Sequence, residues 1–294
     1  MPLEGILTAT VTPFDDEGLL DLKAYDKLLD FVLEKGVHYI VPCGTTGEYY
    51  ALTLEERKSI LNFVSERVGS RARLIAGTNC TTTKEVIELS QYAKELGYEA
   101  VMLASPFCSL PTITELVAHF REVEQAINLP ILLYNNPGRT AVDMNIQFLE
   151  GVQSISRIFG IKESSNSLTR MHEVLMYFGN RFEIVCGSHD QALEYFLWGS
   201  RSWVAGISTF LPTQIIDLYE VCVHKRDFEV GIKKFKKLLP LFALMEGGGK
   251  FIQYCKYGCE LANIPVGSPR PPLMPLSQAE KQQFELLYAQ AIAD

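Results

Sequence analysis

The sequence predicts an α/β protein, a (β/α)8 TIM barrel followed by a C-terminal helical extension. Two observations predict this fold. Short apolar, β-rich runs alternate with longer segments of helical spacing, and the alternation repeats eight times without a long linker. No GxGxxG motif follows any of the expected strands, which disfavours the alternative, an open doubly wound sheet that binds a dinucleotide. Parallel strands joined by helices, repeated eight times, favour closure into a barrel.

The expected strands are the eight apolar runs, Gly5–Phe14, His38–Gly44, Arg73–Asn79, Ala100–Pro106, Pro130–Asn136, Ile158–Glu163, Phe182–Ser188 and Ser202–Ser208. Apolar residues three and four positions apart predict the helices between them, Leu22–Lys35, Leu54–Val68, Lys84–Leu96, Ile113–Ile127, Asn145–Val152, Leu168–Phe178 and Gln191–Trp198.

Local signals mark the ends of several of these helices. Thr53 and Glu56 have the spacing of a capping box, which satisfies free N–H groups at a helix start. Gly36, Gly69 and Gly97 lie where helices are expected to stop.

Beyond Leu211 the pattern becomes purely helical. Further helices are expected at Ile215–His224, Phe228–Met245, Lys250–Leu261 and from about Ser277. We therefore predict a barrel over residues 1–210 and, over residues 211–294, helices packed on it.

Composition excludes several classes of function. The formal net charge is −8 and acidic and basic residues are interspersed, so we expect no nucleic-acid partner. No apolar run reaches the roughly 18 residues of a membrane span, and the start lacks the features of a signal peptide, so we expect no membrane partner and a cytoplasmic location. The seven cysteines form no CxxC pair, and no histidine has metal-ligand spacing, so no metal or other cofactor is expected.

Lys162 is the first candidate catalytic residue. Reacting groups of a (β/α)8 barrel project from the C-terminal ends of the strands, and Lys162 ends the apolar run Phe159-Gly160-Ile161. Burial disfavours its charged form and thereby frees a neutral amine to attack a ketone. The alternative is a structural ion pair with Glu163 or another carboxylate.

Other polar residues close neighbouring strands. Gly44, Thr45 and Thr46 offer hydroxyls and backbone N–H groups suited to a small carboxylate, although glycine–threonine turns are also common caps. Tyr134 has a hydroxyl that transfers a proton or anchors a corner. Arg139 has a guanidinium that clamps a carboxylate or pairs with a surface acid.

Taken together, these segments resemble the dihydrodipicolinate synthase and N-acetylneuraminate lyase family over essentially the whole chain. Gly44-Thr45-Thr46-Gly47-Glu48 is similar to the family's GTTGE loop. The stretch from Tyr134 to Thr140 is similar to its YNxPGRT motif, and the stretch from Gly160 to Ser164 to its GxKE(A/S) lysine strand.

The resemblance implies roles for individual residues. Lys162 would form an imine, or Schiff base, with pyruvate or a related 2-oxo acid, and no cofactor would be needed. Thr45 and Thr46 would hold the carboxylate of that acid, Tyr134 would relay protons and Arg139 would meet a carboxylate of the second substrate. Further substrate contacts are implied at Gly44, Gly187 and Val204. The family fold is a barrel with a helical extension, usually assembled as a homotetramer, a dimer of dimers.

The chain departs from the synthase pattern at three places. Cys108 stands where the synthases have a relay tyrosine, and a thiol is a poor replacement unless its pKa is tuned. The turn Gly187–Asp190 and the segment Gly247–Tyr254 also differ from theirs. The segment Tyr254–Cys259 looks more like that of relatives that deaminate 1-pyrroline-4-hydroxy-2-carboxylate, whereas Arg139 suits a substrate such as aspartate semialdehyde.

Four functions therefore stay open at this point. The first is a synthase that condenses pyruvate with an aldehyde such as aspartate semialdehyde. The second is the deaminase, or another 2-keto-3-deoxy acid aldolase or dehydratase. The third is a barrel that binds a carboxylate but has lost catalysis, and the fourth is a Zn- or Mg-dependent aldolase.

Overall fold

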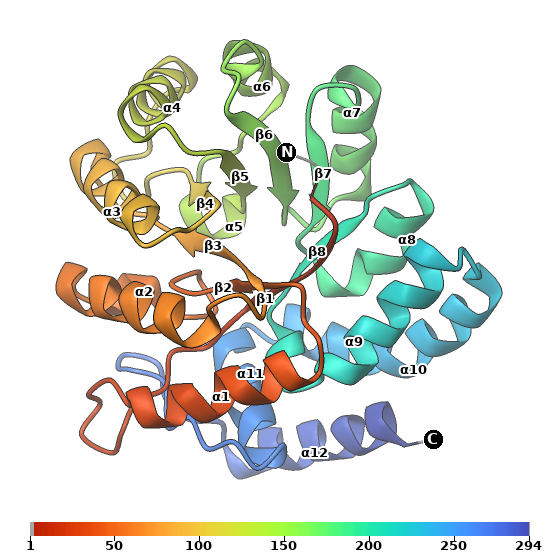
Figure 1. The fold of residues 1–294 in the computed structure, drawn as a ribbon. Helices are drawn as coiled ribbons and strands as arrows, with labels where there is room; N and C mark the ends of the chain where they lie inside the picture. Colours follow the sequence, from red (N-terminus) through yellow and green to blue (C-terminus); the bar gives the residue numbers. More distant parts are fainter. Residues whose placement is uncertain (1–2, 294) are drawn as a thin grey trace.

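The chain folds into a closed barrel of eight parallel strands, as predicted (Figure 1). The structure is a computed structural model and describes residues 3–293. The strands follow one another around the barrel in chain order, and β1 is hydrogen-bonded to β8 as well as to β2. Their bounds are β1 Gly5–Ala9, β2 Tyr39–Val41, β3 Arg73–Gly77, β4 Ala100–Ala104, β5 Ile131–Asn135, β6 Ile158–Glu163, β7 Glu183–Cys186 and β8 Ser202–Ala205.

Most strands are shorter than the apolar runs that predicted them. β1 ends at Ala9, not at Phe14, because the chain then leaves the barrel and the Phe14 N–H binds the carbonyl of Val266 at 3.0 Å. β2 ends at Val41, not at Gly44, because Cys43 adopts a left-handed backbone with φ 57°. The residues lost from the strands form the loops at the barrel mouth.

Helices surround the strands, and α10, α11 and α12 gather on the side that carries α8 and α9 (Figure 1). The Thr53–Glu56 capping box is present at the start of α2. The α-helices are α1 Leu22–Glu34, α2 Leu54–Val68, α3 Thr83–Glu95, α4 Ile113–Ile127, α5 Pro137–Thr140, α6 Ile146–Val152, α7 Leu168–Phe178, α8 Ala192–Leu197, α9 Pro212–Tyr219, α10 Phe228–Gly247, α11 Phe251–Leu261 and α12 Gln278–Ile292. Short helical turns lie at η1 Tyr49–Ala51, η2 His189–Gln191, η3 Ile207–Thr209 and, in π form, η4 Glu220–His224.

Two apolar cores hold the fold together. One lies between the strands and the surrounding helices. The other fills the inside of the barrel with alternate residues of the strands, among them Leu7, Met102, Leu132 and Val185. The barrel is therefore a packed core, and its chemistry is confined to the rim.

The boundary at residue 210 stays a prediction. α9 follows β8 and contacts β1, so it takes the position of the eighth barrel helix, although it lies beyond that boundary. α10, α11 and α12 exceed the eightfold repeat, and α10 packs on both α8 and α9. None of the helices that the structure describes is long and apolar enough to cross a membrane.

Candidate active site

A cavity of about 350 Å³ opens at the C-terminal end of the barrel. The loops after β2, β5, β6, β7 and β8 contribute to its wall, and α10 and α11 cover one side. Seven of the predicted site residues line it: Thr45, Thr46, Tyr134, Arg139, Lys162, Gly187 and Val204. Residues from the ends of five strands thus meet where the fold predicts a site.

Lys162 lies at the floor of this cavity, and its side chain points inward. The register pairs it with Tyr134 of β5, and its Nζ lies 3.9 Å from the centre of the Tyr134 ring. Only 8% of Lys162 is exposed. Within residues 3–293 no carboxylate oxygen lies within 4.0 Å of its Nζ. The structure therefore contradicts the alternative of a structural ion pair at Lys162.

Glu163, the expected partner in that alternative, faces the other side of the strand. Its carboxylate accepts hydrogen bonds from Asn135 Nδ2 and from the Ser165 N–H, and it lies 3.7 Å from Arg170. A shift of register at the start of β6 causes this arrangement, because Ile131 pairs with Ile158 but Leu132 pairs with Gly160. From there on, alternation sends Lys162 inward and Glu163 outward.

Tyr134 is buried beside several groups that favour its ionised form. Burial by itself raises the pKa of its hydroxyl. The positive charge of Lys162, hydrogen bonds with Thr45 and Asn136 and the charge of Arg139 outweigh burial, so the pKa lies below its usual range. The Asn136 amide donates to the hydroxyl at 3.1 Å. A phenol tuned in this way suits proton transfer beside an amine.

A tight turn after β2 presents Thr45 and Thr46 to the cavity. The Gly47 N–H binds the Gly44 carbonyl at 3.0 Å, and the Glu48 N–H binds that of Thr45 at 3.0 Å. A Cβ at Gly47 would lie 3.0 Å from the Thr10 carbonyl oxygen, so the turn leaves little room for a side chain there. Gly44 is buried and shapes the turn, but it does not line the cavity.

Arg139 stands on the short helix α5 at the cavity edge. Its side chain is exposed, and among residues 3–293 it forms no ion pair, which contradicts the alternative of pairing with a surface acid. Its guanidinium is free to meet an anionic group that enters the cavity.

Gly187 and Val204 shape the wall between β6 and β8. A Cβ at Gly187 would lie 2.0 Å from Ser164 Oγ and 2.5 Å from the Glu163 carbonyl oxygen, so only glycine fits. Val204 is an inward residue of β8 and forms part of the floor.

Cys108 lies outside the cavity. It is an exposed residue of the loop after β4, with φ 68°. Among residues 3–293 it is not one of those that line the cavity, so its role as a substitute for a relay tyrosine stays a prediction.

Glu246 was not predicted from the sequence, and His189 appeared only in a turn that differs from the synthases. Glu246 ends α10, which lies outside the eightfold repeat, and both residues line the cavity. Burial by itself raises the pKa of Glu246. Hydrogen bonds from His189 and the charges of His189 and Lys162 outweigh burial, so the pKa lies below its usual range. The one available signal was the break in the helix at Gly247-Gly248-Gly249.

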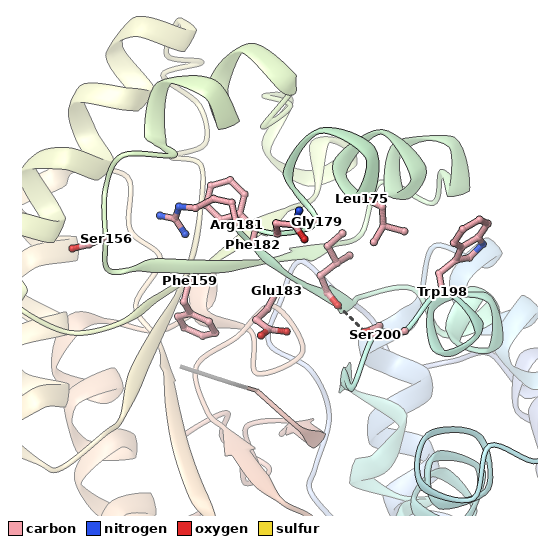
Figure 2. A pocket seen from close by; sticks show the side chains of 12 residues that line it. Ser156, Phe159, Leu175, Gly179, Arg181, Phe182, Glu183, Trp198 and Ser200 are labelled. Atoms are coloured by element: carbon pink, nitrogen blue, oxygen red, sulfur yellow. Dashed lines mark hydrogen bonds between the residues drawn. The ribbon is translucent and has the colours of Figure 1, made fainter.

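A second cavity, of about 530 Å³, lies at the opposite end of the barrel, where β6, β7 and β8 begin (Figure 2). Its main polar groups already have partners. The Arg181 guanidinium donates to the carbonyls of Gln153, Ile155 and Ile158, and the Ser200 hydroxyl donates to that of Ile184. We therefore assign the chemistry to the first cavity.

The residues that the structure describes contain no cluster of side chains suited to a metal ion. Within residues 3–293 no three His, Cys, Asp or Glu side chains lie close enough to hold a metal ion.

Comparisons with known proteins agree with the fold and identify the family. The profile of the dihydrodipicolinate synthetase family matches residues 2–291. The 4-hydroxy-tetrahydrodipicolinate synthase of Pseudomonas putida is 36% identical over 81% of this chain and 82% of its own, and that of Geobacter metallireducens is 32% identical over 96% of both. The chloride-inhibited dihydrodipicolinate synthase of Acinetobacter baumannii, solved with pyruvate, superposes with a TM-score of 0.92 at 27% identity, over 99% of both chains.

Proposed function

Because this chain belongs to the dihydrodipicolinate synthetase family, we propose that it is a lyase whose Lys162 forms a Schiff base with pyruvate or a related small 2-oxo acid. The second substrate would be an aldehyde such as aspartate semialdehyde. One observation carries the proposal: an inward lysine without an ion pair lies at the floor of the cavity, beside a tyrosine and a pair of threonines. The name of the Acinetobacter baumannii relative, solved with pyruvate, supports the choice of 2-oxo acid.

The residues around Lys162 suit each step of such a reaction. The amine adds to C2 of the 2-oxo acid, and the C2 oxygen leaves as water to give a protonated imine. Loss of a proton from C3 gives an enamine, whose C3 attacks the aldehyde carbon while the aldehyde oxygen takes up a proton. The amino group of the second substrate then attacks C2 and releases the Lys162 amine. Tyr134 would carry these protons, and its lowered pKa supports this role.

Thr45 and Thr46 would bind the carboxylate of the 2-oxo acid through their hydroxyls and backbone N–H groups. Arg139 would bind the carboxylate of the aldehyde, since its guanidinium has no other acid to pair with among residues 3–293. Two separate anion sites in the cavity of Lys162 match a reaction that joins two compounds, each of which carries a carboxylate.

Borohydride trapping tests the proposal. We expect intact-mass measurement to show a reduced pyruvyl adduct after incubation with pyruvate and borohydride, because reduction fixes the imine. Lys162→Ala should give no adduct and no turnover, whereas Lys233→Ala, which removes an exposed lysine of α10, should behave like the unaltered protein. An adduct on Lys162→Ala, or none on the unaltered protein, would contradict the proposal and favour a binding barrel without catalysis.

A second candidate is the deaminase of 1-pyrroline-4-hydroxy-2-carboxylate. The presence of Glu246 in the cavity favours it, since a carboxylate there suits a substrate hydroxyl. Release of ammonia from that compound, compared with condensation of pyruvate and aspartate semialdehyde at equal enzyme concentration, would decide between the two reactions.

We also propose that the chain assembles as a homotetramer, a dimer of dimers, and works in the cytoplasm. Exposed apolar side chains support an assembly. Tyr50 and Leu110 are exposed on adjacent loops, which Tyr49 and Phe107 join through ring contacts. All seven cysteines are free thiols, which suits a reducing compartment.

A further inference from the structure

Glu246 is held in one orientation by His189. Its Oε1 accepts hydrogen bonds from the His189 backbone N–H, at 3.0 Å, and from Nδ1 of the same ring. The Nε2 on the other side of the ring accepts from the Ile207 N–H at 3.4 Å, so Nδ1 carries the proton in the neutral ring. Contacts with Trp203 and Phe251 fix the plane of the ring.

The other carboxylate oxygen has no partner. Within residues 3–293 Glu246 Oε2 makes no hydrogen bond, and no lysine or arginine nitrogen lies within 4.0 Å of the carboxylate. The side chain is 19% exposed and lines the cavity, so a carboxylate oxygen without a hydrogen bond belongs to a residue that a bound substrate would meet. A half-buried carboxylate without a donor loses hydration, and a ligand that supplies an N–H or O–H group restores the lost interaction.

The order of the strands separates Glu246 from Arg139. Arg139 follows β5, Lys162 ends β6 and His189 follows β7, so Arg139 and the His189–Glu246 pair flank Lys162 on opposite sides of the rim. A substrate bonded to Lys162 therefore meets a cation on one side and an anion on the other.

We propose that Glu246, positioned by His189, determines specificity by accepting a hydrogen bond from an amine or hydroxyl group on the substrate. This inference rests on the proposed function, because it takes the substrate to be bonded to Lys162 or to react with a group bonded there. His189 acts through Glu246 and is a positioning residue. The pair would give the half-buried carboxylate a function in a cavity that also contains the cations of Lys162 and Arg139.

Two pairs of compounds test which donor Glu246 recognises. The first pair is aspartate semialdehyde and succinic semialdehyde, which differ only by the amino group, each condensed with saturating pyruvate. With succinic semialdehyde, water takes the place of the amino group and hydrolyses the imine to release the Lys162 amine. The second pair is 4-hydroxy-2-oxobutanoate and 2-oxopentanoate, which carries a methyl in place of the hydroxyl, each trapped with borohydride. The preference within a pair is measured as a ratio between its two compounds. For the aldehydes it is the ratio of the kcat/KM values, and for the 2-oxo acids it is the ratio of the half-saturating concentrations.

We expect the unaltered protein to prefer the donor-bearing compound of one pair by about tenfold or more, the usual contribution of a hydrogen bond to a charged group. Glu246→Gln should lower that preference by about tenfold, because it removes the charge but keeps the size. Glu229→Gln, an exposed glutamate of the same helix, is the control and should leave the preference unchanged. A change in the first pair identifies an amine donor, and a change in the second a hydroxyl donor.

No preference in either pair for the unaltered protein would overturn the inference without any variant. A preference that survives Glu246→Gln would overturn it as well, and would leave Glu246 as a structural tie between α10 and η2. In both cases a pyruvyl adduct on Lys162 would show that the proposed function stands. Absence of that adduct would sink the proposed function and this inference together.

Discussion

At the residue scale, the proposed reactivity of Lys162 depends on which groups lie beside its amine. No carboxylate within residues 3–293 neutralises its amine, and the face of the Tyr134 ring, 3.9 Å away, is the main group beside it. An aromatic face attracts an ammonium ion, but it does not neutralise its charge as a carboxylate does. The Lys162 amine is therefore not held in an ion pair within residues 3–293, and the hydroxyl of the same tyrosine remains available for proton transfer.

Tyr134→Phe separates these two roles. The variant keeps the ring beside Lys162 but loses the hydroxyl, so we expect turnover to fall by about 100-fold, the usual scale of general acid–base catalysis, while borohydride still traps pyruvate. Steady-state kinetics and intact mass measure the two effects. Tyr177→Phe, on the exposed face of α7, is the control. A fall in turnover of less than about threefold for Tyr134→Phe would assign the protons to another group.

Lys162, Tyr134 and Thr45 could be predicted from the sequence because they follow apolar runs, and the ends of barrel strands meet at one rim. Glu246 could not be predicted in this way. It stands on a helix after the eightfold repeat, and only the packing of α10 over the barrel brings it to the cavity. Its partner His189 lies 57 positions earlier in the chain.

At the element scale, one buried ion pair fixes the loop after β2. The Glu48 carboxylate lies 3.1 Å from Lys256 Nζ of α11, and both side chains are almost fully buried. The same carboxylate accepts from the Arg270 N–H at 2.9 Å. Burial lowers the pKa of Lys256 to about 8, although Glu48 opposes this shift. The turn that carries Thr45 and Thr46 is thus tied to the C-terminal helices.

We expect Glu48→Gln to lower the free energy of unfolding by about 3–5 kcal/mol, because it leaves the charge of Lys256 buried without its partner. Urea unfolding followed by circular dichroism measures this change. Glu55→Gln, an exposed position of α2, should change the stability by less than about 0.5 kcal/mol. Equal effects of the two substitutions would show that the buried pair contributes no more than a surface pair.

The number and order of the elements followed from the alternation of apolar runs, but their ends did not. The run Gly5–Phe14 reads as one strand, yet Phe14 binds Val266, a residue that is distant in the sequence. Apolar residues that leave the sheet to pack on another segment cannot be told from strand residues by periodicity alone.

At the scale of the whole molecule, the barrel and its helices leave an apolar surface around the loops after β2 and β4. Tyr50 and Leu110 are exposed there, and Cys108 lies two residues before Leu110. Large exposed side chains that cluster in this way often mark contacts between subunits.

We expect analytical ultracentrifugation to give a mass of about four chains, each of 33.0 kDa. Leu110→Asp should shift the protein toward smaller species, because it would bury a charge at a subunit contact. Leu286→Asp, on the exposed face of α12, is the matched control. A monomer for the unaltered protein, or no difference between the two variants, would place the assembly elsewhere or exclude it.

The hydrogen bonds between β1 and β8 also have a consequence for folding during synthesis. They join residues 5–8 to residues 202–205, so the ring cannot close until about two-thirds of the chain has left the ribosome. Until then the nascent sheet has two open edges, and open edges invite pairing with other chains. Synthesis should therefore pass through an interval in which the growing polypeptide depends on protection by molecular chaperones, and this interval should end when β8 emerges.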